Sequence, residues 1–581
     1  MKKTKVVCTL GPSSDSEELI TKLIESGMNV ARINFSHGIH SEHKKKIDLI
    51  KKVRKKLNVP IAIMLDTKGP EVRIKQFENG VINLEKNDQF ILTTEEIIGN
   101  EKKVAITYDK LPQELKIGDA ILADDGLLQF VVDDINGNDI ICNVENGGEL
   151  KNNKSLNFPD TAIKLPAITE KDIDDIVFGI KEDIDYIAAS FIRKTDDVIE
   201  IRRILEENNG EHIQIISKIE NREGVDNIDS IIDISDGIMV ARGDLGVEIS
   251  PEEVPLVQKE IIKKCNVLGK PVITATQMLD SMIRNPRPTR AEVTDVANAI
   301  FDGTDAIMLS GETAAGKYAI ESVETMVRIA IKTETSSEYR RLMTHHFSGD
   351  TSVTNVISHA TCSTAEQLKA SAIITVTSSG YTARMASKFR PTSPIIALTD
   401  DERVVRLLSL VWGIQCVETD CFNDTDSMFK KSILTVVNQG LVNLGDLVVI
   451  SAGLPLGVKG ATNMIKVQTI GDVIIRGAGI GKQAATGVAR IIDQNKNDKF
   501  EKGDIVVTYG VDRDNISYVK EASGVITEEA GLTSQGAIAA LQFGIPIVVG
   551  AKECLKLIED GTIVTIDPQR GLIYNGKATV M

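Results

Sequence analysis

Short runs of apolar residues alternate with amphipathic stretches through about the first 320 residues of the chain. Polar residues follow each run, and then a stretch such as Ser16–Ser26 places apolar residues at helical intervals. Eight consecutive β-α units predict a closed parallel (β/α)8 TIM barrel of the α/β class, with its site at the carboxyl ends of the strands. An open, doubly wound sheet is the alternative on this pattern. The eight runs are Thr4–Leu10, Met28–Ile33, Ile61–Leu65, Tyr186–Ser190, Ile213–Ser217, Gly237–Ala241, Pro271–Ala275 and Ala306–Ser310.

The third β-α unit is interrupted after the segment Asp66-Thr67-Lys68-Gly69-Pro70. For about ninety residues, segments such as VINL, QFILTT and LLQFVVDD alternate apolar and polar positions between NG, GD and DG turns. This pattern predicts an inserted β-barrel domain that acts as a lid and excludes water from the site. A peripheral domain without a catalytic role is the alternative.

Two further units follow the barrel pattern. From about Thr351 to Gly471 the strands SAIITVT, PIIALT and DLVVIS alternate with helical stretches, which predicts an α/β domain. Its turn Thr377–Thr382 is rich in hydroxyls and precedes a helix, as in an anion pocket, although such residues are also ordinary helix caps. The glycine-rich and strand-rich remainder begins at Asp472. We therefore expect a barrel over residues 1–72 and 163–345, a lid over 73–162, an α/β domain over 346–471 and a fourth domain over 472–581.

Length and composition agree with several folded domains. A chain of 581 residues exceeds the size of one hydrophobic core, and 42% hydrophobic with 26% charged residues is ordinary for a globular protein. The net charge of −16 disfavours broad nucleic-acid binding. The lysines and arginine between Lys44 and Lys56 alternate with apolar positions and predict one solvated helix face.

The spacing of the cysteines and the length of the apolar runs indicate where in the cell the protein is located. Seven cysteines lie far apart without a metal-binding or disulfide pattern, as expected in a reducing cytoplasm. The apolar run near the start is broken by Gly11 and Pro12, and no later run approaches the ~20 apolar residues of a membrane helix. We expect a cytoplasmic protein.

Charged side chains follow the predicted strands. Lys218 and Glu220 come after the fifth run, and Arg242 and Asp244 after the sixth. Such charges can simply solvate the start of a loop, but the same pattern recurs at other strand ends. Cations and carboxylates gathered at one barrel face suit phosphoryl transfer, in which a divalent ion and positive side chains neutralise the transferring group. The set comprises Arg32, Arg73 and Lys218 as cations and Asp66, Glu220 and Asp244 as anions. No GxxxxGK[ST] segment is present, so a nucleotide would bind without a P-loop.

Seven segments together resemble the pyruvate kinase family: VCTLGPSS, ARINFSHG, MLDTKGPEVR, SKIEN, ARGDLGVE, TATQMLDSMIRNPRPTRAEVTDVANA and IMLSGETAAGKYA. The resemblance covers residues 1 to about 471. It implies a TIM barrel with a lid, an α/β regulatory domain and a homotetramer. It also implies an allosteric, ATP-binding transferase of glycolysis that moves the phosphoryl group of phosphoenolpyruvate to ADP, giving pyruvate and ATP.

The resemblance also implies roles for individual residues. Lys218, Arg32 and Thr276 match catalytic positions, and the substrate contacts are Arg32, Lys218, Gly243, Asp244 and Thr276. Glu220 and Asp244 match the ligands of Mg²⁺ or Mn²⁺, whereas the K⁺ site matches Asn34, Ser36, Asp66 and Thr67. The nucleotide contacts match Asn34, Phe35, Ser36, His37, Arg73 and Lys154. Glu71 resembles the residue of potassium-dependent members, where independent ones carry lysine.

Two departures from the family pattern leave questions open. Thr377–Thr382 lacks the basic residue of some family members, so the small phosphorylated effector can be a sugar phosphate or a nucleotide. The last domain resembles the swivelling phosphohistidine domain of phosphoenolpyruvate-using enzymes, but Gln535 stands where that domain carries histidine. A catalytically degenerate regulatory protein and a metal-dependent lyase remain as alternative functions.

Overall fold

A computed structural model of the chain describes residues 2–124, 126–159, 161, 163–344, 351–422, 424–455, 460–471, 473–492 and 499–579. The chain divides into two compact units. The first comprises residues 1–350, 387–390 and 401–416, and the second comprises residues 351–386, 391–400 and 417–581. No helix among the described residues has the length and apolar character needed to span a bilayer.

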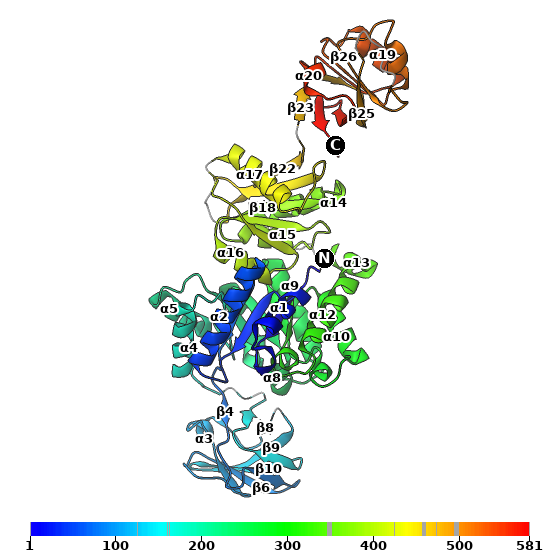
Figure 1. The fold of residues 1–581 in the computed structure, drawn as a ribbon. Coiled ribbons are helices and arrows are strands. Elements are labelled where there is room, and N and C mark those ends of the chain that lie inside the picture. Colours follow the sequence, from blue (N-terminus) through cyan, green and yellow to red (C-terminus); the bar gives the residue numbers. More distant parts are fainter. Residues whose placement is uncertain are drawn as a thin grey trace. The chain divides into compact units, whose positions relative to one another are not determined.

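The first unit contains the predicted closed barrel, drawn from blue to green in Figure 1. Its strands are β1 (Lys5–Thr9), β2 (Val30–Asn34), β3 (Ala62–Asp66), β13 (Tyr186–Ala189), β14 (Gln214–Ile219), β15 (Gly237–Ala241), β16 (Val272–Ala275) and β17 (Ala306–Leu309). They run parallel in the order β1-β17-β16-β15-β14-β13-β3-β2, so the open-sheet alternative is wrong. Side chains such as Val7, Met64, Tyr186 and Met239 pack together in a buried cluster and exclude water from it. Burial of each large apolar side chain contributes about 1.5–3 kcal/mol.

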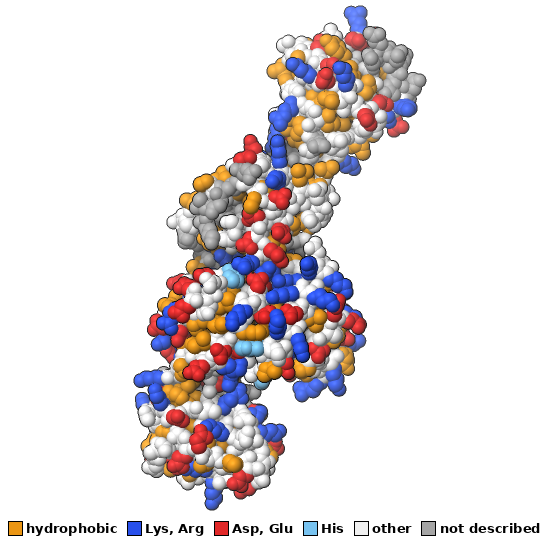
Figure 2. All heavy atoms as spheres, turned by 60° about the vertical axis from the view of Figure 1, so that its left-hand side comes forward, with side chains coloured by type: hydrophobic (Ala, Val, Ile, Leu, Met, Phe, Trp, Pro, Cys, Tyr) orange, Lys and Arg blue, Asp and Glu red, His pale blue; other side chains and the backbone are white. Residues whose placement is uncertain are grey.

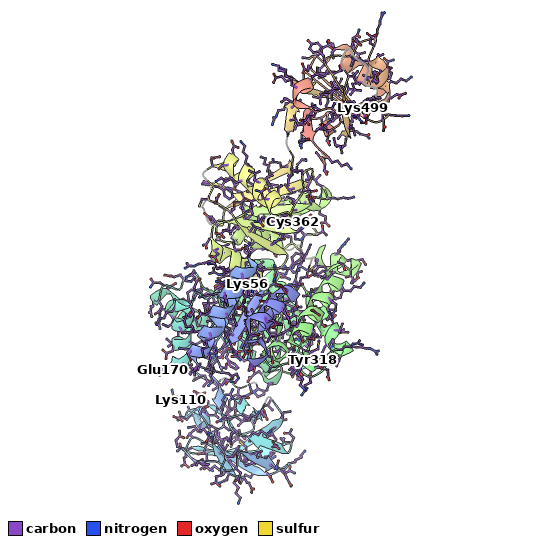
Figure 3. The ribbon with its side chains drawn as sticks, viewed as in Figure 1. Lys56, Lys110, Glu170, Tyr318, Cys362 and Lys499 are labelled. Atoms are coloured by element: carbon purple, nitrogen blue, oxygen red, sulfur yellow. The ribbon has the colours of Figure 1, made fainter. Side chains whose placement is uncertain are left out.

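Helices surround the barrel. They are α1 (Glu17–Ser26), α2 (His40–Leu57), α4 (Glu170–Lys181), α5 (Thr195–Glu207), α6 (Arg222–Asp226), α7 (Ile228–Ile234), α8 (Arg242–Glu248), α9 (Val254–Leu268), α10 (Arg290–Asp302), α11 (Gly311–Ala314), α12 (Ala319–Glu334) and α13 (Ser337–Thr344). The longer ones, such as α1, α5 and α12, bury apolar side chains. In α2, Ile47, Ile50 and Val53 are buried, and the basic residues lie on the outer face, as predicted. Lys56 (Figure 3) pairs with Glu17 of α1 at 3.0 Å. Basic and acidic side chains are interspersed over the face drawn in Figure 2.

The inserted segment folds as a β domain with its own core, including Phe90, Leu92 and Phe130. Its strands are β4 (Val72–Arg73), β5 (Val81–Leu84), β6 (Gln89–Thr93), β7 (Lys103–Ala105), β8 (Ala120–Ala123), β9 (Leu128–Asn136), β10 (Asp139–Val144), β11 (Gly148–Lys151) and β12 (Ser155–Asn157), with the short helix α3 (Leu111–Glu114). Seven strands form a sheet in the order β4-β12-β8-β9-β10-β6-β7. A bridge between Ile74 and Ile106, one residue beyond β4 and β7, joins the two edges of this sheet and gives it the form of a small barrel.

The second unit contains the last domain and most of the predicted α/β domain, except residues 387–390 and 401–416, which belong to the first unit. The α/β sheet has the order β20-β19-β18-β21-β22, in which β22 is antiparallel to β21. Its elements are α14 (Val353–Gln367), β18 (Ala372–Val376), α15 (Tyr381–Ser387), β19 (Ile395–Thr399), α16 (Glu402–Leu407), β20 (Ile414–Glu418), α17 (Thr425–Asn438), β21 (Leu447–Gly453) and β22 (Thr462–Thr469). The limits of the four predicted domains stay a prediction, since the two compact units do not divide the chain at that level.

The last domain is built on an eight-stranded mixed sheet in the order β23-β30-β29-β25-β26-β27-β28-β24. Its elements are β23 (Val473–Arg476), β24 (Ala478–Ile480), β25 (Ala485–Ile491), β26 (Ile505–Thr508), α18 (Ile516–Glu521), β27 (Gly524–Thr527), α19 (Gln535–Phe543), β28 (Ile547–Val549), α20 (Cys554–Leu557), β29 (Ile563–Asp567) and β30 (Leu572–Asn575). Gln535 is the first residue of α19, whose N-cap Ser534 accepts a hydrogen bond from the Ala537 amide.

Candidate active site

A buried cluster of charged side chains lies at the carboxyl ends of β2, β3 and β14. Asp66, the last residue of β3, accepts a hydrogen bond from Arg32 Nε at 2.7 Å. The Lys218 ammonium on β14 lies 3.2 Å from the other Asp66 oxygen and 2.9 Å from Glu220 Oε1. Parallel strands bring these residues together from positions far apart in the chain. The sequence therefore predicted correctly that these strand ends converge, although Lys218 lies within β14 rather than after it.

The cluster shifts the ionisation of its members. Burial would lower the pKa of Lys218, but the negative charges of Asp66 and Glu220 raise it above the ordinary value, so the ammonium stays charged. Burial would also raise the pKa of Asp66, but Arg32 and Lys218 lower it. Burial raises the pKa of Glu220 to about 7. The negative charge of Asp244 adds to this rise, and the positive charge of Lys218 opposes it.

Ser190 is a member of the site that the sequence did not reveal. It directly follows β13, its Oγ accepts a hydrogen bond from the Lys218 ammonium at 2.8 Å, and it donates to the Thr67 carbonyl at 2.7 Å. The Ser190 amide in turn donates to Thr67 Oγ1 at 3.1 Å. The hydroxyl thus directs the Lys218 ammonium. Its position at the end of the fourth predicted strand was the signal that could have identified it.

The neighbouring strands β15 and β16 contribute Gly243, Asp244 and Thr276. Gly243 and Asp244 lie in the first turn of α8, and the Gly243 amide donates to Thr276 Oγ1 at 2.6 Å. Thr276 follows β16 with φ at +68°, a left-handed conformation that is unfavourable for a β-branched residue. The Arg242 guanidinium donates to the Thr276 carbonyl at 2.8 Å and is held by Asp295 of α10. These contacts fix the Thr276 side chain at the mouth of the barrel.

The residues matched to K⁺ and nucleotide lie on two sides of the site. Asn34 and Asp66 are register partners in β2 and β3, and the Asn34 side chain accepts the Ser36 amide at 3.0 Å. The Phe35 side chain is fully buried and stacks on His43 with ring centroids 3.9 Å apart, so only its backbone can serve the site, whereas His37 is exposed.

Arg73 and Lys154 belong to the inserted domain, on the adjacent strand ends of β4 and β12. The Ile74 amide donates to the Lys154 carbonyl at 3.0 Å, which places the two basic residues close together. Arg73 contacts Glu71 at 2.7 Å, and Lys154 contacts Asp124 at 2.6 Å. A nucleotide phosphate would therefore compete with these carboxylates.

A cavity of about 480 Å³ lies between the inserted domain and the barrel within the first unit. Its lining includes Glu71, Arg73, Phe191, Asp244 and Glu248. The Asn157 side chain of β12 donates to Glu248 of α8 at 2.8 Å across this region. The inserted domain therefore contacts the barrel beside the charged cluster.

A separate cavity of about 230 Å³ in the second unit is lined by the predicted turn. Thr377, Ser378, Ser379 and Thr382 line it together with Asp400. Several hydroxyls together with one carboxylate suit a phosphorylated ligand that also carries hydroxyl groups.

A closed barrel with a lysine held between carboxylates at its strand ends, and a β domain inserted beside them, defines a barrel enzyme that acts on an anionic substrate. Comparison with known proteins is more specific. The family model "Pyruvate kinase, barrel domain" matches residues 1–323, and "Pyruvate kinase, alpha/beta domain" matches residues 355–468. The model "PEP-utilising enzyme, mobile domain" matches residues 500–571. The chain belongs to the pyruvate kinase family.

Individual relatives agree with this assignment. Pyruvate kinases of Bacillus licheniformis (51% identical) and Geobacillus stearothermophilus (50% identical) match over 100% of this chain and 100% of their own. A crystal structure of a pyruvate kinase from Cryptosporidium parvum matches at 40% identity with a TM-score of 0.76, covering 80% of this chain and 96% of its own. The predicted family, fold class and class of enzyme, a phosphotransferase, are confirmed, and the alternative of a degenerate regulatory protein has no support.

Proposed function

We propose that this chain transfers the phosphoryl group of phosphoenolpyruvate to ADP in glycolysis, giving pyruvate and ATP. The observation that carries the proposal is the Lys218 ammonium, which lies 2.8 Å from Ser190 Oγ and 2.9 Å from Glu220 Oε1 in a buried site. A compact ammonium, kept charged by Asp66 and Glu220, suits a transferring phosphoryl group, whose charge is spread over three oxygens.

The side chains of the cluster divide the work of binding and transfer. Lys218 and Arg32 neutralise the phosphoryl oxygens, and Asp66 holds both cations in place before the substrate arrives. Preorganised charges of this kind are each worth about 3–4 kcal/mol in a transition state. Thr276 and Gly243, already in contact at 2.6 Å, hold the non-transferring part of the substrate.

Glu220 and Asp244 fit a divalent cation. Both supply the hard oxygen ligands that Mg²⁺ prefers, and Glu220 Oε1 is buried beside the Lys218 ammonium at 2.9 Å. No group of three His, Cys, Asp or Glu in the described part of the chain could hold a metal by itself, which agrees with a site completed by substrate oxygens. Bound Mg²⁺, or Mn²⁺, would supply positive charge to the phosphate oxygens.

Asn34, Ser36, Asp66 and Thr67 supply the oxygens expected of a K⁺ site. All four lie at the adjacent ends of β2 and β3, where Asn34 and Asp66 are register partners. We assign Asn34 to His37, Arg73 and Lys154 to the nucleotide, as the family resemblance implies. Arg73 lines the cavity, and the Lys154 carbonyl accepts the amide of the next residue, Ile74.

Three further assignments extend the proposal. The cavity at Thr377–Thr382 takes the small phosphorylated effector, with the hydroxyls at the phosphate and Asp400 at a ligand hydroxyl. The enzyme works as a homotetramer, as the resemblance implies. All seven cysteines are free thiols, which supports a reducing, cytoplasmic location.

The test is an assay of the purified chain with phosphoenolpyruvate, ADP, Mg²⁺ and K⁺, in which pyruvate and ATP are both quantified. The proposal predicts equimolar pyruvate and ATP and no turnover without ADP or a divalent cation. Pyruvate released with inorganic phosphate in the absence of ADP would contradict it.

A further inference from the structure

We propose that the first turns of α4 couple the inserted domain to the nucleotide-binding loop. The coupling residues are Lys171, Asp172 and Asp175, named here the α4 clasp. The inference rests on the proposed nucleotide role of Asn34 to His37. It assigns to these three residues a positioning role in ADP binding. Figure 3 labels Glu170, the residue at which α4 begins.

Asp172 contacts both segments that connect the inserted domain to the barrel, one before the insertion and one after it. One carboxylate oxygen accepts the amides of Lys68 at 3.0 Å and Gly69 at 3.2 Å, immediately before the insertion. The other accepts the Thr169 amide at 3.1 Å and its hydroxyl at 2.5 Å, at the N-cap of α4, where the connection that follows the insertion ends. The carboxylate is 1% exposed, so its charge is stabilised by these donors rather than by water. A single side chain thus holds both ends of the insert.

The connection before the insert also packs against the catalytic cluster. Gly69 has φ at +70°, and a Cβ there would lie 2.8 Å from the Ser190 side chain and 2.8 Å from the Phe191 ring. Ser190 accepts the hydrogen bond of the Lys218 ammonium. A displacement of Gly69 would therefore reach the strand end that directs Lys218.

The same turns of α4 hold the nucleotide loop. The Lys171 ammonium donates to the Phe35 carbonyl at 2.8 Å and to Asp175 at 2.6 Å. Asp175 is also 2.6 Å from His40 Nε2, at the first residue of α2. Because the Phe35 side chain is anchored in the core, the Phe35 carbonyl is held on one side by packing and on the other by Lys171. The clasp therefore contacts the nucleotide loop and the insert connections within five residues of one helix.

The consequence is that the insert connections and the nucleotide loop cannot move independently. A movement of the insert that displaces Lys68 and Gly69 shifts Asp172, and the rigid helix passes the shift to Lys171 and the Phe35 carbonyl. ADP binding should then depend on Asp172 even though that side chain is buried away from the ligand.

The test uses five full-length proteins: wild type, Lys171→Met, Asp172→Asn, the double variant, and Asp174→Asn as a matched control on the exposed face of α4. Hydrogen–deuterium exchange is measured on peptides covering residues 34–43 and 66–74, together with KM for ADP and for phosphoenolpyruvate. We expect faster exchange in both peptides for Lys171→Met and for Asp172→Asn, and no change for the control. KM for ADP should rise about tenfold in each single variant, as loss of one charge-assisted hydrogen bond predicts, with a smaller change for phosphoenolpyruvate.

Coupling further predicts that the double variant raises KM for ADP by less than the product of the two single effects. Multiplicative effects, or exchange that changes only in the peptide next to the substituted side chain, would overturn the proposal. If Asp172→Asn does not fold, the exposed Lys171→Met variant alone tests the coupling. Faster exchange at residues 66–74 would support it, and unchanged exchange there would overturn it. The exchange readout does not depend on turnover, so an inactive wild type would refute the proposed function while the coupling is still tested.

Discussion

Asp295 holds Arg242 through two contacts of 2.7 Å, one from each terminal guanidinium nitrogen. The same guanidinium donates to the carbonyl of Thr276, whose backbone is in the left-handed region. Such a conformation costs about 1–3 kcal/mol and persists only where surrounding contacts impose it. The ion pair between α8 and α10 therefore keeps Thr276 in place for the substrate.

Asp295→Asn should weaken this arrangement without touching the substrate. We expect kcat/KM for phosphoenolpyruvate to fall about tenfold, as loss of one charged contact predicts, while KM for ADP changes little. Steady-state kinetics with each substrate varied in turn checks this, with the exposed Asp196→Asn as control. Equal loss for both substrates would show that the pair merely stabilises the fold.

Glu71 is predicted to determine the requirement for potassium. It lines the cavity and contacts Arg73 at 2.7 Å, so its charge also offsets a cation that we assign to the nucleotide. A lysine here would supply the positive charge that K⁺ otherwise provides. Glu71→Lys should therefore retain activity without K⁺, while Glu71→Gln, which removes charge without adding a cation, should still require it. A wild type that is fully active without any monovalent cation would disprove this.

His43 should make stability depend on pH. Burial and the nearby Lys46 lower its pKa below the ordinary value, although Asp175 opposes the shift. The unfolded chain takes up the proton first, so this contribution to stability is complete above about pH 6.5 and is lost as pH falls through the folded-state pKa. The thermal midpoint of His43→Phe should fall less than that of wild type between pH 7.5 and pH 5.5. His359→Phe, on α14, is the control and should follow wild type; identical pH slopes for wild type and His43→Phe would refute the assignment.

The last domain should not carry phosphate. The seven histidines are at 37, 40, 43, 212, 345, 346 and 359, and Gln535 begins α19 where a phosphohistidine domain would need its nucleophile. The Thr579 amide donates to the Gly445 carbonyl at 2.6 Å, and Thr469 Oγ1 donates to the Thr579 carbonyl at 2.8 Å, so the segment at Thr579 contacts the α/β domain. A chain ending before Asp472 should keep most of its kcat and lose thermal stability or effector response. Acid-labile label on the full chain after incubation with labelled phosphoenolpyruvate, or a folded but inactive truncated chain, would contradict this.

The sequence predicted much of the fold because its signals are local. Each barrel strand is a short apolar run, and polar residues at the strand ends, such as Asp66 and Lys218, mark the site. Ser190, Asp172 and Asp295 were missed because their roles depend on partners distant in the chain: Lys218 for Ser190, Lys68 for Asp172 and Arg242 for Asp295. No periodicity reports such contacts. The buried Phe35 side chain likewise could not be recognised within a loop of polar residues.

Lys218 should stabilise the transferring phosphoryl group. The most direct measurement compares kcat and the Kd for phosphoenolpyruvate of Lys218→Met with those of wild type, with the exposed Lys194→Met as control and the thermal midpoint as a check on folding. Because the ammonium acts mainly in the transition state, kcat should fall by about 10²–10³ or more while phosphoenolpyruvate still binds. A folded Lys218→Met enzyme with nearly normal kcat would contradict the account.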